Sequence, residues 1–417
     1  MGALSTNETA RRRRLQTVGV LSGLTAGAWL GAAEAPTKLV VAGLSPILVS
    51  FCMVIGVFLA RWSAPALVRG LGAVADDARR APHLIVWGVL AGCLWAVANT
   101  LTVYAIRDVG LSIAFPLWNT NSVIGMLWGV LFFGELRTAR RARQITVVAG
   151  VLVLFVAALL IADASAAQAP RRDVVHGIAA ALAAGVLWGT MYIPYRKAYL
   201  TGMNPLSFLT FFTIGEVITM SVLALGESGG VVPLWHALTA ARPALFWLLL
   251  GGFVWVLGDL AQQYAVKYVG ISRGIPLSNT NQLWGLLWGV LVFGELRGAS
   301  ITVRLMIIGG SVLMLLAAGA IASASADERE HDRWDAAAAR ETARYGVGAE
   351  LTSGGRRRTW ADWAIVALAT GTFIAFASLA QVPRLAIRVE WLYLLVAVSL
   401  SLLAVWATTL WRTTRFT

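Results

Sequence analysis

The chain contains one stretch twice, as FPLWNTNSVIGMLWGVLFFGELR at 115–137 and as IPLSNTNQLWGLLWGVLVFGELR at 275–297. Aligned at an offset of 160, the two copies agree at 16 of 23 positions, which indicates an internal duplication. Each copy is apolar and long enough to span a membrane, yet an Asn-Thr-Asn triplet lies in its middle. Because hydrocarbon tolerates such side chains only where they face protein, water or a ligand, the triplets predict a functional site.

The composition predicts a membrane protein. Of the 417 residues, 58% are hydrophobic and only 13% are charged, and apolar runs of membrane-spanning length recur along the chain. The predicted fold class is therefore an all-α polytopic membrane protein, and a soluble protein is excluded. Spans are expected at about 15–33, 38–60, 84–106, 110–133, 143–162, 174–194, 204–225, 244–266, 271–294, 301–321, 360–380 and 390–411.

The duplication extends over five spans. At offsets of 158 to 160, residues recur from span to span, including the pairs Gly27/Gly185, Gly56/Gly215 and Trp95/Trp255. The repeats cover residues 15–162 and 174–321. Because each repeat has an odd number of spans, the second copy must insert upside down, which gives a ten-helix core of two inverted five-helix repeats. Alternating-access carriers have this architecture, with the substrate near the midplane where the repeats meet.

Other parts of the chain lie outside this repeat pattern. Residues 322–359 alternate acidic and basic side chains before an SGGRRR run, as is typical of a solvated cytosolic insert or linker. Residues 360–411 predict an accessory transmembrane hairpin, for stability or for pairing into a homodimer. The basic start followed by GAAEAP also resembles a secretory signal, but a cleaved leader would not recur 158 residues later.

The basic residues predict the orientation in the membrane. The chain has 34 Lys and Arg residues and a net charge of +13, which by itself could also indicate nucleic-acid binding. If the N-terminus is cytosolic, 25 of the 34 fall in cytosolic segments, among them the four arginines between Arg61 and Arg80. We therefore expect no nucleic-acid partner. The N-terminus, the insert and the C-terminus are predicted on the cytosolic side of the cytoplasmic membrane.

The triplets supply the candidate substrate site. Amide and hydroxyl side chains donate and accept hydrogen bonds at once, as a neutral polyol requires, although they can also simply join helices. Pro116 and Pro276, three residues before the triplets, are expected to break both helices there. The candidate substrate-binding residues are Asn119, Thr120, Asn121, Asn279, Thr280, Asn281 and Gln282.

Four of the 18 tryptophans join this candidate site. Most Trp side chains are expected in the interfacial belts of a membrane protein. Four lie away from the loop charges or beside the triplets, where an aromatic face could stack on the apolar C–H face of a sugar ring. They are Trp118, Trp188, Trp255 and Trp284.

Two carboxylates lie inside predicted spans, and we expect them to couple transport to protons, Asp259 before Glu216. The alternative for Asp259 is an ion pair, for which Arg273 is the expected partner. Three amides join the candidate site because of their positions relative to Asp259, namely Gln262 and Gln263 on the same helix face and Asn99 at the repeat-equivalent position.

Three stretches resemble known sugar carriers. The stretch GDLAQQYAVKYVGISRGIPLSNTNQLWGLLWGVLVFGEL at 258–296 resembles the glucose/ribose porter family of the drug/metabolite transporter superfamily. The stretches GVLWGTMYIPYRKAY at 185–199 and WAVANTLTVYAIRDVGLSIAF at 95–115 are similar to segments of L-rhamnose/proton symporters. The resemblance covers about residues 15–321. It implies a ten-span core that carries sugars in symport with a cation, for which H⁺ is expected.

Together these observations predict a secondary active transporter for a neutral sugar, whether hexose, pentose or deoxy-sugar. The alternatives are a drug, metabolite or amino-acid exporter of the same superfamily, or a membrane scaffold or receptor without transport. No enzyme is expected, because the chain has no Walker loop, nucleophile elbow or paired catalytic carboxylates in a soluble segment. Its four His and two Cys residues have no ligand spacing, so we expect neither a metal nor a cofactor.

Overall fold

The protein is all-helical throughout the part of the chain that the structure describes. This computed structural model describes residues 6–33, 44–109, 114, 117–137, 139–165, 173–294, 298–324, 326, 328–345, 357–381 and 387–416. In the first half the helices are α1 (Thr6–Ala32), α3 (Pro46–Val68), α4 (Leu71–Arg80), α5 (Pro82–Val109), α7 (Asn121–Phe133) and α8 (Arg141–Ser165). In the second they are α9 (Val174–Leu200), α10 (Pro205–Ser228), α11 (Val231–Ala240), α12 (Arg242–Val269), α13 (Ile271–Ser278), α14 (Asn281–Leu287), the π-helix η2 (Trp288–Val292) and α15 (Ile301–Ser323). The remaining helices are α16 (Glu328–Tyr345), α17 (Trp360–Leu379) and α18 (Val389–Thr414).

Nine helices of the described chain are long and apolar enough to cross a membrane. They confirm the predicted polytopic fold and correspond to nine of the twelve expected spans. The other three differ from a simple span. The helix α1 is long enough but less apolar, because it carries four arginines in its first half. The span expected at 110–133 is described only in part, as α7, and the one at 271–294 is broken into α13, α14 and η2.

Equivalent caps begin the second helix of each half. Ser45 precedes α3, and its Oγ accepts a hydrogen bond from the Leu48 amide at 3.1 Å. Asn204, 159 residues later, precedes α10, and its Oδ1 accepts from the Leu206 amide at 2.9 Å. A proline follows each cap in the first helical position, where its missing N–H costs nothing. The duplicated sequence therefore starts both helices by the same local mechanism.

The two halves meet at two repeat-equivalent contacts, each between a glycine of one half and a backbone carbonyl of the other. A Cβ on Gly56 of α3 would lie 2.1 Å from the carbonyl oxygen of Leu249 in α12. A Cβ on Gly215 of α10 would lie 2.1 Å from the carbonyl oxygen of Val89 in α5. Gly215 is the repeat equivalent of Gly56, and Leu249 is that of Val89. Each half therefore supplies the glycine of one contact and the carbonyl of the other. Two-fold-related repeats would pack in this way, and their inverted insertion stays a prediction.

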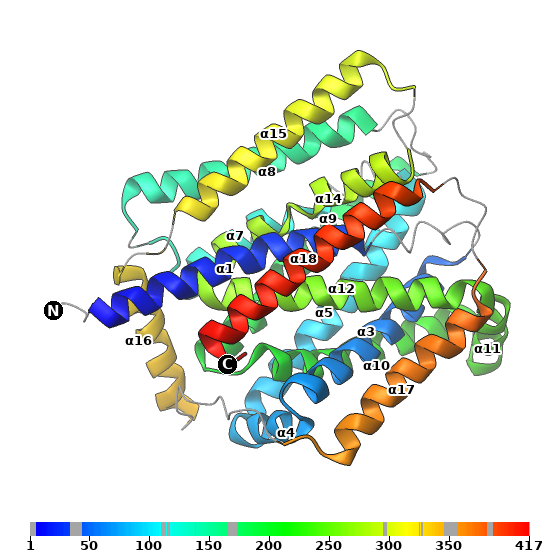
Figure 1. Cartoon of the computed structure of the whole chain (residues 1–417), viewed down its shortest axis with the longest axis horizontal. Coiled ribbons are helices and arrows are strands. Elements are labelled where there is room, and N and C mark those ends of the chain that lie inside the picture. Colours follow the sequence, from blue (N-terminus) through cyan, green and yellow to red (C-terminus); the bar gives the residue numbers. More distant parts are fainter. Residues whose placement is uncertain are drawn as a thin grey trace.

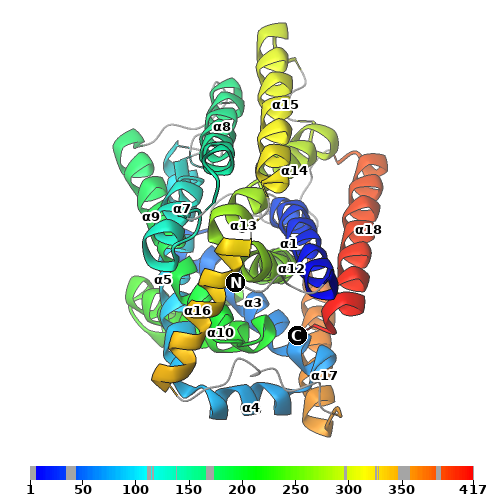
Figure 2. The ribbon, with the colours of Figure 1, turned by 90° about the vertical axis from the view of Figure 1, so that its left-hand side faces the viewer.

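The helices α17 and α18 lie along one side of the bundle, while α8 and α15 pair at another edge (Figures 1 and 2). The Trp406 indole of α18 donates a hydrogen bond to Ser22 Oγ of α1 over 2.8 Å. The Phe373 ring of α17 packs edge-on against Phe253 of α12, with 5.1 Å between centroids. These two helices therefore pack on core helices of both halves.

The helix α16 packs against the end of the bundle where the N-terminus lies (Figure 2). Two of its side chains are buried, since Glu330 is fully shielded and Trp334 lies under the guanidinium of Arg196 at 4.2 Å. The Tyr345 ring stacks on His83 of α5 with 3.8 Å between centroids. One face of this helix is thus held against both halves of the chain, while most of its other side chains are exposed or half-buried.

Candidate functional site

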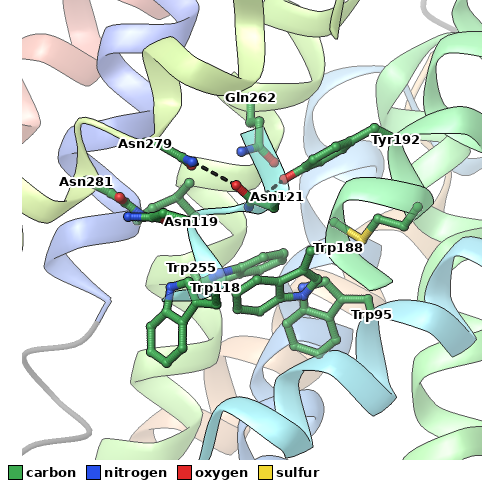
Figure 3. Close-up of a pocket in the computed structure, with 12 residues that line it drawn as sticks. Trp95, Trp118, Asn119, Asn121, Trp188, Tyr192, Trp255, Gln262, Asn279 and Asn281 are labelled. Carbon is green, nitrogen blue, oxygen red and sulfur yellow. Dashed lines mark hydrogen bonds between the residues drawn. The ribbon is translucent and has the colours of Figure 1, made fainter. Parts of the chain in front are cut away.

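A small polar and aromatic pocket lies where the two halves meet. It is lined by Leu30, Trp95, Trp118, Asn119, Asn121, Trp188, Met191, Tyr192, Trp255, Gln262, Asn279 and Asn281, which we call the central pocket (Figure 3). Eight of these residues form four repeat-equivalent pairs, Leu30/Trp188, Trp95/Trp255, Asn119/Asn279 and Asn121/Asn281. The pocket therefore draws on both copies of the duplicated sequence, with five of its lining residues from the first half and seven from the second.

Four tryptophans form one side of the pocket, which we call the aromatic face (Trp95, Trp118, Trp188 and Trp255; Figure 3). Trp95 and Trp255 lie with centroids 4.8 Å apart at 58°, and Trp118 and Trp188 meet edge-on at 5.9 Å and 81°. Such tilted pairs hold each other's orientation. The aromatic face thus offers preset ring surfaces to a ligand.

Amide side chains form the opposite side, the amide face (Asn119, Asn121, Gln262, Asn279 and Asn281; Figure 3). The helix break after Ser278 places two of them, because Asn279 lies in the turn and Asn281 begins α14. Asn279 Nδ2 donates to Asn121 Oδ1 at 2.7 Å and to Ser122 Oγ at 2.6 Å. The helix break, which the sequence predicts near Pro276, therefore places Asn279 and Asn281 at the pocket. Carriers with discontinuous helices form their substrate sites in a similar way.

Within the described part of the chain, three buried polar atoms of the pocket have no hydrogen-bond partner. They are Nε1 of Trp95, Nε1 of Trp188 and Oδ1 of Asn281. Buried polar groups are nearly always paired, so unpaired ones in a pocket indicate where a ligand or water binds. Two donors and one acceptor beside apolar rings match the alternating hydroxyls and C–H faces of a sugar.

The central pocket is contracted, with a volume of about 60 Å³. Ligand pockets usually measure roughly 300 to 1,000 Å³, so this one must widen before it can hold a monosaccharide. Two larger cavities exist elsewhere. One of 320 Å³ between the core and α18 is lined almost only by apolar atoms, which do not suit a polyol. One of 680 Å³ lies between α1, α13 and α15, away from the triplets.

Several predicted site residues lie outside the central pocket. The hydroxyls of Thr120 and Thr280 turn back to the carbonyls of Leu117 and Leu277, both at 2.8 Å. Each threonine packs under a glycine of the neighbouring helix, Thr120 under Gly185 and Thr280 under Gly27. These two hydroxyls therefore support helix packing, which is the alternative that the sequence left open.

Four further predicted residues support the pocket from behind or lie apart from it. Gln282 accepts from Asn119 Nδ2 at 3.2 Å and donates to the Ala158 carbonyl at 3.0 Å. Asn99 donates to Ser50 Oγ at 3.1 Å and joins α5 to α3. Trp284 is half-buried beside Gly31, and Gln263 belongs to the charge cluster described below. Pro116 lies outside the described residues.

The sequence interpretation missed four residues of the pocket, namely Leu30, Trp95, Met191 and Tyr192. The repeat could have revealed the first two, because Trp95 is the equivalent of Trp255 and Leu30 that of Trp188. Tyr192 accepts a hydrogen bond from Asn121 Nδ2 at 3.3 Å. At the same offset of 158, Tyr192 and Met191 correspond to Glu34 and Ala33, which differ from them in chemistry, so only the tertiary contacts place them here.

A buried charge cluster adjoins the pocket and corrects two predictions. The Arg61 guanidinium binds both predicted coupling residues, Glu216 Oε2 through Nη1 and Asp259 Oδ2 through Nη2, each at 2.7 Å. The three side chains are fully shielded from solvent. The predicted partnership of Asp259 with Arg273 is therefore wrong. Arg61 also does not belong to a cytosolic loop, because α3 continues to Val68 and carries Arg61 inside the bundle.

Arg273 instead binds α16. Its two terminal nitrogens donate to the carboxylate of Glu330 at 2.8 and 2.9 Å, and the Leu136 amide donates to Glu330 Oε1 at 3.2 Å. Burial by itself raises the pKa of Glu330, but these hydrogen bonds and the charges of Arg273 and Arg196 lower it below its usual value. The carboxylate of Glu330 is thus held ionised at this end of the bundle.

Glu135 closes the same end from the first half. Its carboxylate accepts from the Ile271 amide at 3.1 Å and from the Ser272 amide at 2.9 Å, the first two residues of α13. A carboxylate at a helix N-terminus satisfies orphan donors and complements the helix dipole. Glu135 therefore caps α13, a helix of the other half.

Comparisons with known proteins identify a family and several relatives of this chain. The profile of a family described as sugar transport protein matches residues 39–164 and 180–347. A glucose uptake protein of Staphylococcus xylosus is 23% identical over 213 residues, which cover 51% of this chain and 69% of that protein. A putative sugar uptake protein of Listeria innocua is 23% identical over 231 residues, covering 54% and 74%. One from Streptococcus pyogenes is 39% identical over 85 residues, covering 20% and 28%.

The profile match covers most of both halves and α16, and it leaves α1, α17 and α18 outside. The relatives are named for sugar uptake, so the resemblance to sugar porters and the prediction of a transporter rather than an enzyme are confirmed. Since the profile matches more than half of this multi-pass membrane protein, the chain belongs to the sugar transport protein family.

Proposed function

We propose that this protein moves a neutral monosaccharide across the cytoplasmic membrane by alternating access, in symport with H⁺. The observation that carries the proposal is the central pocket, in which four Trp rings face five amides at the junction of the halves. The rings suit the apolar C–H face of a sugar and the amides suit its hydroxyls. The relatives named as glucose and sugar uptake proteins support the same substrate class.

Selectivity for a neutral sugar follows from the chemistry of the lining. No charged side chain lines the central pocket among the described residues, so an ionic substrate would lose its hydration without a counter-charge. Each amide both donates and accepts, which fits hydroxyls whose protons can rotate. A hexose, a pentose and a deoxy-sugar all satisfy this pattern.

Alternating access is supported by the state of the pocket and of the helices beside it. The volume of about 60 Å³ indicates that the pocket is in a contracted state, too small for a monosaccharide. At the end of the bundle that carries the N-terminus, Glu135 ties α13 to the first half and Glu330 ties α16 to Arg273. Release of such contacts on one side at a time is how inverted repeats expose a central site alternately.

The buried carboxylates supply the basis for proton coupling. Asp259 lies one helical turn after Trp255, which belongs to the aromatic face, and Glu216 reaches the same guanidinium from α10. Ionisable groups kept inside a transporter core commonly form ion or proton pathways. We infer that these groups exchange a proton with each transport cycle.

The test is uptake by purified protein in liposomes. Labelled D-glucose, D-xylose and L-rhamnose represent the three sugar classes, and an inward proton gradient is imposed or omitted. The proposal expects saturable accumulation of at least one sugar that depends on the gradient. Asn281→Ala, inside the pocket, should reduce uptake, while Asn99→Ala, a buried amide outside it, should not. Flux of amino acids or drugs alone would favour an exporter, and absence of all flux would favour a scaffold.

A further inference from the structure

We propose that Arg61, Glu216 and Asp259 form a site for one proton, that Glu216 takes the proton, and that Asp259 remains the permanent counter-ion of Arg61. The inference rests on the proposed symport, and it assigns a new role to Arg61 and reverses the order of the two carboxylates that the sequence suggested. It is argued from the charges, the hydrogen bonds and the position of the cluster.

The charge count gives the capacity for one proton. One guanidinium faces two carboxylates, so the cluster has a net charge of −1 when both are ionised. Among the described residues, no second cation forms an ion pair with either carboxylate. An uncompensated charge in a shielded interior is unfavourable, and one bound proton makes the cluster neutral. A second proton would leave Arg61 without a counter-charge.

The hydrogen bonds of the two carboxylates are unequal. Asp259 uses both oxygens, since Oδ2 accepts from Arg61 and Oδ1 accepts from Gln263 Nε2 at 2.9 Å. Gln263 in turn accepts from the Tyr199 hydroxyl, which fixes the orientation of its amide. Glu216 uses Oε2, whereas its Oε1 is buried and has no partner among the described residues. Because a carboxylate oxygen without a donor gains most from protonation, the proton binds Oε1 of Glu216.

The groups around the cluster leave this assignment intact. The side chains of Tyr192, Tyr195 and Tyr199 lie beside it on α9, and an ordinary phenol is uncharged at physiological pH. Phe212 of α10 and Trp255 of α12 place their rings beside the Arg61 guanidinium, at 4.2 and 5.3 Å. These two rings lie against the cation and do not titrate, so the two carboxylates are the groups at the guanidinium that can exchange a proton.

The same contacts connect the proton site to the sugar pocket. Trp255 presents one part of its ring system to Arg61 and pairs with Trp95 on the aromatic face of the pocket. Asp259 follows Trp255 by one turn of α12, and Gln262 of the amide face follows Asp259. Since Arg61 belongs to the first half and both carboxylates to the second, proton binding loosens one of the two ionic links that this cluster makes between the halves. The proton thereby acts on the contact that must change when the halves move.

The only covalent bond that forms and breaks in the cycle is the O–H bond of protonated Glu216. H⁺ enters from the outer solution and binds Glu216 Oε1, which converts the carboxylate to a neutral acid and weakens its link to Arg61. After the halves rearrange, the proton leaves to the cytosol, and the carboxylate pairs with Arg61 again. If the cluster were neutral without the proton, the halves could rearrange without binding one. Sugar movement would then not depend on the proton.

The proton site is tested without sugar by infrared difference spectroscopy of the purified protein between acidic and alkaline buffer. A protonated carboxylic acid gives a carbonyl band that a carboxylate lacks. We expect a band that disappears in Glu216→Gln and that shifts when all Glu residues carry ¹³C, but not when all Asp residues do. A shift only with labelled Asp would overturn the assignment to Glu216, and a band unchanged in Glu216→Gln would overturn the proton site.

Transport assays test the coupling. Glu216→Gln keeps the pair of Arg61 with Asp259, so it should retain sugar counterflow and lose at least tenfold of the accumulation driven by a proton gradient. Asp77→Asn is the matched control, because Asp77 is a buried carboxylate paired with another arginine, Arg69, at 3.1 Å. It should keep gradient-driven accumulation. Normal accumulation in Glu216→Gln would contradict the inference.

The proposed function and the proton site can each fail without the other. If the wild-type protein transports no sugar but gives the Glu216-dependent band, the proposed substrate is wrong and the proton site stands. If it accumulates sugar with a proton gradient but gives no such band, the proposed function stands and the proton binds elsewhere.

Discussion

Asn279 and Asn121, one from each copy of the Asn-Thr-Asn triplet, are joined by a hydrogen bond of 2.7 Å from Asn279 Nδ2 to Asn121 Oδ1. The reciprocal residues are Asn119 and Asn281. Asn119 instead donates to Gln282 Oε1 at 3.2 Å, and the buried Oδ1 of Asn281 has no partner. The duplicated triplets are therefore used unequally, and the inequality leaves an acceptor exposed to the pocket.

Asn281→Ala tests that acceptor. Because Oδ1 makes no bond without ligand, its removal should leave the thermal stability nearly unchanged. With sugar bound, one hydrogen bond is lost, at a cost of about 0.5 to 1.5 kcal/mol or roughly 2- to 12-fold in affinity. Asn279→Ala should differ, since it strands Asn121 and Ser122 and should cost about 1 to 3 kcal/mol of stability. Equal stability losses in both variants would contradict the asymmetry.

Trp188→Phe should weaken sugar binding while keeping the aromatic face. The substitution removes a buried, unpaired Nε1–H and retains a ring, so the protein without sugar should be as stable as wild type or slightly more stable. The affinity should fall by about 2- to 12-fold if the indole binds a sugar hydroxyl. Trp62→Phe is the control, because its buried Nε1 is also unpaired but lies outside the pocket. Isothermal titration and thermal unfolding give the two readouts.

Gly215→Ala should be strongly destabilising. Its Cβ would lie 2.1 Å from the Val89 carbonyl oxygen, so α10 and α5 would have to separate. Overpacking of this kind costs about 1 to 3 kcal/mol or more. Gly226→Ala in the same helix meets no atom within 4 Å, and it should stabilise the helix by at most about 1 kcal/mol. Thermal unfolding in detergent compares the two, and equal melting temperatures would refute this close approach.

Glu330→Ala should release α16 from the bundle. The change leaves Arg273 buried without its carboxylate, and breaking a buried pair in this way costs about 3 to 5 kcal/mol. Trypsin should then cut at the arginines of α16 much faster than in wild type. Glu341→Ala removes a more exposed ion pair of the same helix, with Lys197 at 3.5 Å, and should cost less than about 1 kcal/mol. Resistance of Glu330→Ala to trypsin would show that other contacts hold α16.

The attachment of α16 should also depend on pH. The pKa of Glu330 is lower in the folded protein than its ordinary value of 4.5. The ionised form is thus the one that folding favours, so its contribution is fully present above the ordinary pKa and is lost as the pH falls through the lowered folded value. Proteolytic release of α16, followed with an acid-active protease, should rise below about pH 4.5 in wild type. In Glu330→Gln, release should be less dependent on pH.

The sequence by itself determined the membrane-spanning helices, the duplication and much of the central pocket. Hydropathy fixes where a helix can cross hydrocarbon, and the repeated triplets mark the two places where polar side chains interrupt such a run. Eight predicted residues line the pocket, including Asn119, Asn279 and Trp255. These are local properties of the chain, so they are readable before any contact is known.

Only the tertiary structure decided which of these polar side chains face the pocket and which face other helices. Asn281 and Thr280 are neighbours in sequence, yet one points into the pocket and the other packs under Gly27, because the helix break rotates each side chain differently. Arg61 has no counterpart in the patterns that identified Asp259 and Glu216. It lies 155 residues before Glu216 and 198 before Asp259, and only the convergence of α3, α10 and α12 brings the three charges together. A buried charge is stabilised by whichever partner packing supplies, and packing over such separations is not encoded in any local pattern.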